Sequence, residues 1–357
     1  MPRSSPSHFY RDTRDAAKIV VVDLGFLGDT VHLLPALWEI KDHYPGAALH
    51  VLSSPLGCEV LQMVKCVDRA WSFPLGPPSP HWWEHWGLIQ KLRRERFDVA
   101  FNFSGADRTV LVTAAIRARR TLAYQGARQH FWQPWLISDW LPKQPLRTPA
   151  YEGRRHLLEL AGFQLKPSRF DLVIPADDLA QASKSVPSNS VHFSLSASSP
   201  LKEWPLQRWI ELARLCLEKH PDWTILASGS SNPREQDRLK QFASALNSQR
   251  VQLLPPGLSI ARLAAIISKC RIHAGADSGV LHLAVALNTK TLAIFRDYSG
   301  AADWLPVGIR HRHLMQPCPC ANQPHPDCAP SGEARCLAQI TAPQAAALLE
   351  ELRSPQL

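Results

Sequence analysis

The residues best suited to chemistry first gather in a short turn near the N-terminus. This turn, Leu24–Asp29, follows the β-branched run Lys18–Asp23, which predicts a buried parallel strand. Gly25 and Gly28 allow a sharp turn and a close approach of a ligand to the backbone. Asp29 then stands at the carboxyl end of a strand, where open α/β sheets bind ligands. An Asp here could equally serve only to cap the following helix. The glycine spacing is not G-x-G-x-x-G, so it does not indicate a dinucleotide site.

A second turn of small residues predicts an anion site. It follows a strand over 271–274 and leads into a helix over 279–287, through Asp277, Ser278 and Gly279. Backbone N–H groups and the dipole at a helix start favour a phosphate there. His282 lies one turn inside that helix. The alternative is that Asp277 or Ser278 only caps the helix and His282 only packs.

A third candidate is Lys202, in the stretch S-A-S-S-P-L-K-E-W-P-L-Q-R-W that follows a predicted strand over 191–195. A lysine at the carboxyl end of a strand is a point charge well suited to a diphosphate. A solvated lysine beside a Pro-rich turn is the alternative. Trp204 and Trp209 are expected to anchor this loop in the core.

Strands alternate with helices in two separate series, which predicts two doubly wound α/β domains. The sequence predicts these parts in chain order: a loose lead-in over 1–18, an N-terminal Rossmann-like domain over 19–178, a linker over 179–189, a C-terminal Rossmann-like domain over 190–340, and a terminal helix over 341–357 that packs back on the N-terminal domain.

Composition narrows the class of protein. The chain has 357 residues, a length that suits two domains, and a formal net charge of +9. That charge favours a phosphate-bearing ligand or an anionic membrane surface. No apolar run approaches the ~20 residues of a membrane helix, and the polar N-terminus lacks a secretory signal. No dense basic run or nucleic-acid-binding signature is present, so no nucleic-acid partner is expected.

Taken together, the three motifs resemble the signatures of glycosyltransferase family 9, which contains the heptosyltransferases of lipopolysaccharide assembly. They are L-G-F-L-G-D-T-V-H-L-L-P-A-L, then the stretch around Lys202, then D-S-G-V-L-H-L-A-V-A-L, and they stand in the family's order. The resemblance spans about 18–352. It implies a GT-B fold, in which two Rossmann-like domains face each other across a cleft.

The resemblance also implies roles for individual residues. Asp29, beside Gly28 on the acceptor side, matches the family's general base, and Lys202 matches the lysine that binds the diphosphate. The remaining donor-side matches are Ser198, Ser199, Glu235, Asp277, Ser278, Gly279 and His282. Glu235 would hold the ribose hydroxyls.

The implied reaction is inverting transfer of a sugar from a nucleotide-sugar, with ADP-heptose as the expected donor and neither cofactor nor metal. The expected acceptor is an anionic, lipid-linked glycan of the lipopolysaccharide core. The protein would be cytoplasmic, with peripheral contact at the inner face of the cytoplasmic membrane. The alternatives are a GT-B transferase with another donor or a protein acceptor, a GT-B-like epimerase, and a non-catalytic nucleotide-sugar-binding protein.

Two features are not covered by the three family motifs: a pair of departures from the family's usual residues, and a cluster of cysteines. Leu195 replaces a histidine found in many members, and Phe295-Arg296 replaces Phe-Gly after the last strand. Near the C-terminus, four cysteines could supply thiolates to a zinc ion, although their C-x-C spacing and wider later intervals are unlike strong zinc motifs. They are Cys318, Cys320, Cys328 and Cys336.

Overall fold

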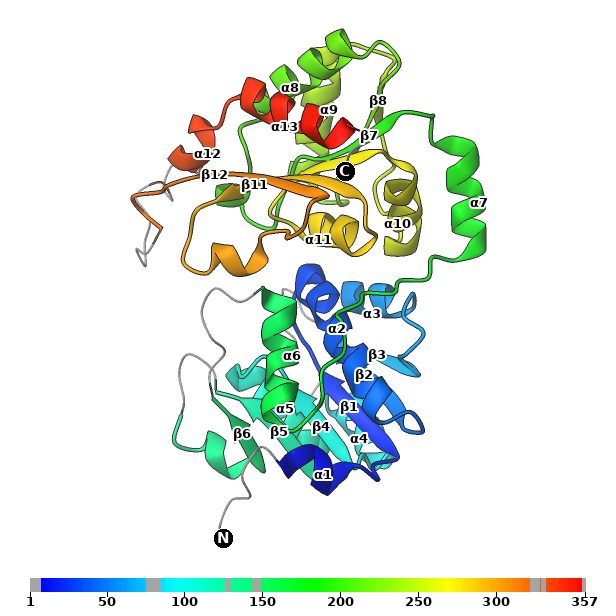
Figure 1. Cartoon of the computed structure of the whole chain (residues 1–357), viewed down its shortest axis with the longest axis vertical. Helices are drawn as coiled ribbons and strands as arrows, with labels where there is room; N and C mark the ends of the chain where they lie inside the picture. The colour runs from blue at the N-terminus through cyan, green and yellow to red at the C-terminus, as the bar shows by residue number, and fades with distance from the viewer. Residues whose placement is uncertain are drawn as a thin grey trace. The chain divides into compact units, whose positions relative to one another are not determined.

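The computed structural model describes residues 8–74, 85–125, 130–142, 149–321, 328 and 332–354. The chain forms two compact units, Met1–Val173 and Ile174–Leu357. Each unit contains a six-stranded parallel sheet with helices packed on it (Figure 1). This confirms the predicted α/β fold with two doubly wound domains. That the two units face one cleft stays a prediction.

The sheet of unit 1 has the strand order β3-β2-β1-β4-β5-β6. Its central strand β1 is buried from its second residue onward, which explains its continuous apolar run. The strands are β1 (Lys18–Val22), β2 (Ala48–Ser53), β3 (Arg69–Ser72), β4 (Val99–Asn102), β5 (Arg120–Tyr124) and β6 (Asp139–Leu141). The helices are α1 (Phe9–Thr13), α2 (Leu27–His43), α3 (Pro55–Leu61), α4 (Trp86–Arg94), α5 (Asp107–Ile116), the 3-10 turn η3 (Gln133–Trp135) and α6 (Ala150–Leu160).

The sheet of unit 2 has the order β12-β11-β10-β7-β8-β9, so its first strand again lies inside the sheet. The strands are β7 (Ser190–Ser194), β8 (Thr224–Ser228), β9 (Val251–Leu253), β10 (Ile272–Ala276), β11 (Lys290–Arg296) and β12 (His311–Gln316). The helices are α7 (Ala176–Ser185), α8 (Leu206–Lys219), α9 (Pro233–Leu246), α10 (Ile260–Lys269), α11 (Gly279–Ala286), α12 (Arg335–Gln339) and α13 (Ala342–Arg353), with the 3-10 turns η4 (Pro200–Lys202) and η5 (Ala301–Trp304).

Strand order places the candidate residues within each unit. In both sheets the strand order reverses beside the first strand, so the loops after β1 and β4, and after β7 and β10, diverge at the carboxyl edge, the position where open α/β sheets bind ligands. Asp29 follows β1, Lys202 follows β7 and Asp277 follows β10 directly. The fold therefore brings the predicted residues of each unit to the edge where ligands bind.

The structure corrects the predicted boundaries at three places. The lead-in is not loose over its described part, because α1 buries Phe9 against the core of unit 1; residues 1–7 lie outside the description. The predicted linker, 179–189, is largely the helix α7, which packs on α10 through the buried Ala182. The terminal helix α13 belongs to unit 2. It packs on α8 and buries Leu349 and Leu352 in the core of unit 2.

Candidate functional site

Asp29 lies in the first turn of α2, where a local hydrogen bond fixes its carboxylate. The backbone N–H of Phe26 donates to Oδ2 of Asp29 at 2.9 Å, so the aspartate does cap its helix. A Cβ at Gly25 would lie 2.4 Å from Cβ of Asp29, so only glycine leaves room for this arrangement. The Asp29 side chain nevertheless remains 27% exposed, so it is still reached by solvent.

Arg154, which the sequence did not single out, completes the polar edge of unit 1. Its Nη2 lies 3.3 Å from Oδ1 of Asp29, and its Nη1 is buried without a hydrogen-bond partner among the residues described. A second carboxylate, Asp23, accepts a hydrogen bond from the Thr30 hydroxyl at 3.2 Å. Burial raises the pKa of Asp23 to about 6; the charge of Arg154 opposes this rise and the nearby Asp29 carboxylate contributes to it.

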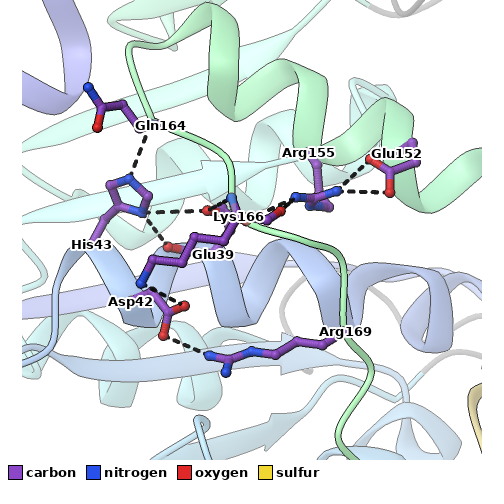
Figure 2. Close-up of polar contacts among 8 residues, drawn as sticks. All are labelled: Glu39, Asp42, His43, Glu152, Arg155, Gln164, Lys166 and Arg169. Carbon is purple, nitrogen blue, oxygen red and sulfur yellow. Dashed lines mark hydrogen bonds and ion pairs between the residues drawn. The ribbon is translucent and has the colours of Figure 1, made fainter.

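A network of charged residues joins the helices that carry Asp29 and Arg154 (Figure 2). Glu39 of α2 and Arg155 of α6 are both buried, and their side chains approach to 3.3 Å. Glu39 also accepts the backbone N–H of Lys166 at 3.1 Å, while Arg155 donates to Glu152 at 2.6 and 2.8 Å. Because a buried charge is tolerated only when paired and hydrogen-bonded, this network fixes α6 against α2. By fixing the two helices that carry these residues, the network also stabilises the contact between Arg154 and Asp29.

In unit 2, the candidate residues meet around the carboxylate of Asp277. Nζ of Lys202 lies 2.8 Å from Oδ2 of Asp277, and Nε2 of His282 lies 3.8 Å from its Oδ1. The hydroxyl of Tyr298 donates to Oδ2 at 3.0 Å. Burial alone would raise the pKa of Asp277, but contact with His282 and the charge of Lys202 outweigh it and hold that pKa below its usual value. Tyr298 is a site residue that the sequence analysis missed.

The start of α11 offers backbone donors to the same place. Its N-cap residue, Ser278, makes no capping hydrogen bond through its side chain, and the Ser278 hydroxyl is buried with no partner within the described part of the chain. The first helical residue is Gly279, so no side chain covers the N–H groups there. An uncapped helix start beside Lys202 is well suited to an anion such as a phosphate.

The loop between β7 and α8 is held by an acid that the sequence analysis did not consider. Glu203, 8% exposed, accepts the N–H of Ala197 at 3.0 Å and pairs with Arg234 at 2.6 Å. These contacts fix the loop that carries Ser198, which is exposed, and Ser199, which is half-buried. The loop therefore presents small polar side chains and Lys202 from a rigid base.

Glu235 is not part of the Asp277 cluster. It lies in the first turn of α9, and its Oε2 accepts the backbone N–H of Ser230 at 2.9 Å. This contact supports the turn after β8, next to Gly229. The predicted contact with ribose hydroxyls stays a prediction.

The four C-terminal cysteines are buried in the core cluster of unit 2. The Cys318 and Cys336 thiols contact each other. Burial raises the pKa of Cys336 to about 11, and the contact with Cys318 contributes to that rise. Among the residues described, no three His, Cys, Asp or Glu side chains are arranged to hold a metal ion. These thiols have the character of buried apolar side chains in this structure.

Two doubly wound parallel units, with polar side chains at the carboxyl edge of each sheet, define a GT-B α/β protein. Comparisons with known proteins are specific. The model of glycosyltransferase family 9 (heptosyltransferase) matches residues 85–329. Lipopolysaccharide heptosyltransferase 1 of Pseudomonas aeruginosa is 25% identical over 327 residues, covering 85% of each chain. The chain therefore belongs to glycosyltransferase family 9 and is a glycosyltransferase.

Solved structures agree on the fold. The ADP-heptose lipopolysaccharide heptosyltransferase II of Escherichia coli superposes with a TM-score of 0.75 at 18% identity, covering 95% of this chain and 100% of that one. The E. coli heptosyltransferase WaaC with ADP-2-deoxy-2-fluoro heptose gives a TM-score of 0.72 at 17% identity, covering 94% and 99%. No helix in the described ranges is long and apolar enough to cross a membrane.

Proposed function

We propose that this glycosyltransferase moves a heptose from ADP-heptose to a hydroxyl of the lipopolysaccharide core. The observation that carries the proposal is the cluster of Lys202, Asp277, His282 and Tyr298 at the uncapped start of α11. Such a site suits the diphosphate of a nucleotide-sugar. The names of the relatives support heptose as the sugar and lipopolysaccharide as the acceptor, and the WaaC structure supports an ADP-linked donor.

In the proposed mechanism, Asp29 of unit 1 accepts the proton of the acceptor hydroxyl as that oxygen attacks the anomeric carbon. The bond from this carbon to the diphosphate breaks and ADP leaves, so one displacement inverts the anomeric configuration. General-base assistance of this kind contributes about a hundredfold to ten-thousandfold in rate. Lys202 and the N–H groups at Ser278 and Gly279 stabilise the charge that develops on the diphosphate.

Because the proposed acceptor is lipid-linked, the enzyme would work at the inner face of the cytoplasmic membrane. The proposed reaction uses no resident cofactor. The formal net charge of +9 supports attraction to an anionic surface.

The test is to incubate the purified protein with ADP-heptose, UDP-glucose or GDP-mannose, with and without a heptose-deficient lipopolysaccharide. ADP release and the acceptor mass are then measured. We expect ADP release that depends on the acceptor, with a gain of one heptose. Transfer only from another nucleotide-sugar would refute the donor. Epimerised nucleotide-sugar without transfer would indicate an epimerase, and binding without release of nucleotide would indicate a non-catalytic protein.

A further inference from the structure

The positive charges at the proposed diphosphate site differ in whether they are already paired. Lys202 is already paired with Asp277 at 2.8 Å, so part of its charge is offset before a ligand binds. A second cation, Arg296, is the last residue of β11 and stands at the same carboxyl edge of the sheet. β11 packs against η4, the turn that ends in Lys202.

Arg296 also lies close enough to Tyr298, a member of the Asp277 cluster, for its charge to act on that residue. Its charge lowers the pKa of Tyr298, opposing the larger effects of burial and of the Asp277 carboxylate, which together raise that pKa. The Tyr298 hydroxyl is the group that donates to Asp277. Arg296 therefore lies near both the lysine loop and the acidic centre of the site.

The Arg296 side chain is half-buried, and its Nε is fully shielded from solvent yet has no hydrogen-bond partner in the part of the chain described here. The neighbouring carboxylate of Asp297 is directed elsewhere, because it accepts the backbone N–H of Cys318 at 2.9 Å. Leaving a guanidinium half-buried and unpaired is costly, whereas an anionic ligand would satisfy it.

We propose that Arg296 is a donor-binding residue that takes the diphosphate of the nucleotide-sugar. This inference rests on the proposed function. A guanidinium can bind two phosphate oxygens at once in a planar fork, which a lysine amine cannot do. Arg296 would therefore supply a positive charge and the orientation, beside the amine of Lys202, whose charge is already shared with Asp277.

The test compares ADP with adenosine, which lacks phosphate, by isothermal titration calorimetry on the full chain. Arg296→Gln removes the charge, and Arg296→Lys keeps it without the fork. Arg271→Gln is the matched control, because Arg271 is an exposed arginine just before the amino end of the neighbouring strand β10. We expect Arg296→Gln to weaken ADP binding by about tenfold or more, Arg296→Lys to recover part of it, and Arg271→Gln to bind as the wild type does. Adenosine binding should change little in all three.

Wild-type affinity for ADP in Arg296→Gln, or an equal loss for adenosine and ADP, would overturn the inference. If the glutamine variant does not fold, the lysine variant decides, because loss of the fork should still weaken ADP binding measurably without affecting adenosine. Failure of the proposed function is distinguishable. If the wild type binds another nucleoside diphosphate and not ADP, the donor assignment fails, and the same variants tested with that nucleotide decide the role of Arg296.

Discussion

The amine of Lys202 and the carboxylate of Asp277 form an ion pair of 2.8 Å at the carboxyl edge of the unit 2 sheet. Asp277 is 5% exposed and is also bonded to Tyr298, so this carboxylate orients the lysine from a fixed base. Because the lysine side chain stays 31% exposed, a ligand can still reach its amine. A bound diphosphate would then be a second anion, beside Asp277, in contact with Lys202. The N–H groups at the start of α11 and the Arg296 guanidinium would supply further positive charge to it.

Lys202→Ala is expected to weaken ADP binding by about tenfold to a hundredfold and also to lower kcat. The lysine should contact the diphosphate in the bound state and more strongly as ADP leaves. Calorimetry gives the first effect and the acceptor-dependent rate at saturating donor gives the second. An unchanged ADP affinity would reduce Lys202 to a partner of Asp277. Lys219→Ala, a substitution on the exposed end of α8, serves as the control.

Asp29→Asn should lower kcat by at least about a hundredfold while leaving ADP affinity nearly intact. The amide cannot accept the acceptor's proton, yet its oxygen can still receive the N–H of Phe26 and cap α2. Turnover is followed by ADP release, and ADP binding by calorimetry. A variant that retains more than about a tenth of wild-type kcat would rule out the general-base role.

Arg154→Gln is expected to lower kcat by about tenfold, with a smaller change in KM for the donor. Removing the guanidinium releases Asp29 from its 3.3 Å contact and removes the positive charge that offsets the mutual repulsion of the Asp23 and Asp29 carboxylates. Arg154→Lys should recover part of the rate, because it restores the charge. Equal rates for the glutamine and lysine variants would mean that Arg154 acts only through packing.

The sequence predicted the strands and the site turns best where a continuous apolar run ends in small or polar residues. Lys18–Asp23 and 191–195 are such runs, and both proved to be central strands. α6 was missed because Gly153 and adjacent arginines interrupt its apolar pattern, and Arg154 was missed with it. Tyr298 could not be found locally. It stands 21 residues from Asp277 along the chain, and only the pairing of β10 with β11 brings the two together.

Acid is expected to destabilise unit 2 through two buried histidines on adjacent strands. Nδ1 of His192 lies 2.8 Å from Nδ1 of His273, and both side chains are fully buried. Burial lowers the pKa of His192 to about 3 and that of His273 well below its usual value. The unfolded chain binds protons near pH 6.5, so stability is complete above that pH and declines as the pH falls, by about 1.4 kcal/mol per pH unit for each group.

Urea unfolding between pH 7.5 and 5 measures this slope. His192→Gln should flatten it, whereas His156→Gln, at a site where the side chain is 39% exposed, should leave it unchanged. A slope identical in the wild type and His192→Gln would place the acid sensitivity elsewhere. Because the chain has two units, the transition of unit 2 must be resolved from that of unit 1.

Turnover is expected to survive excess EDTA. Metal-dependent transferases neutralise the donor diphosphate with a divalent cation held by carboxylates. Here the carboxylate of Asp277 at the proposed diphosphate site is already paired with Lys202, and Arg296 adds a second positive charge that would repel a cation. The rate should therefore be unchanged during a short incubation. Slow loss restored by zinc alone would indicate a structural ion at the cysteines. Fast loss restored by magnesium or manganese would instead show that a metal, and not Lys202 and Arg296, neutralises the diphosphate.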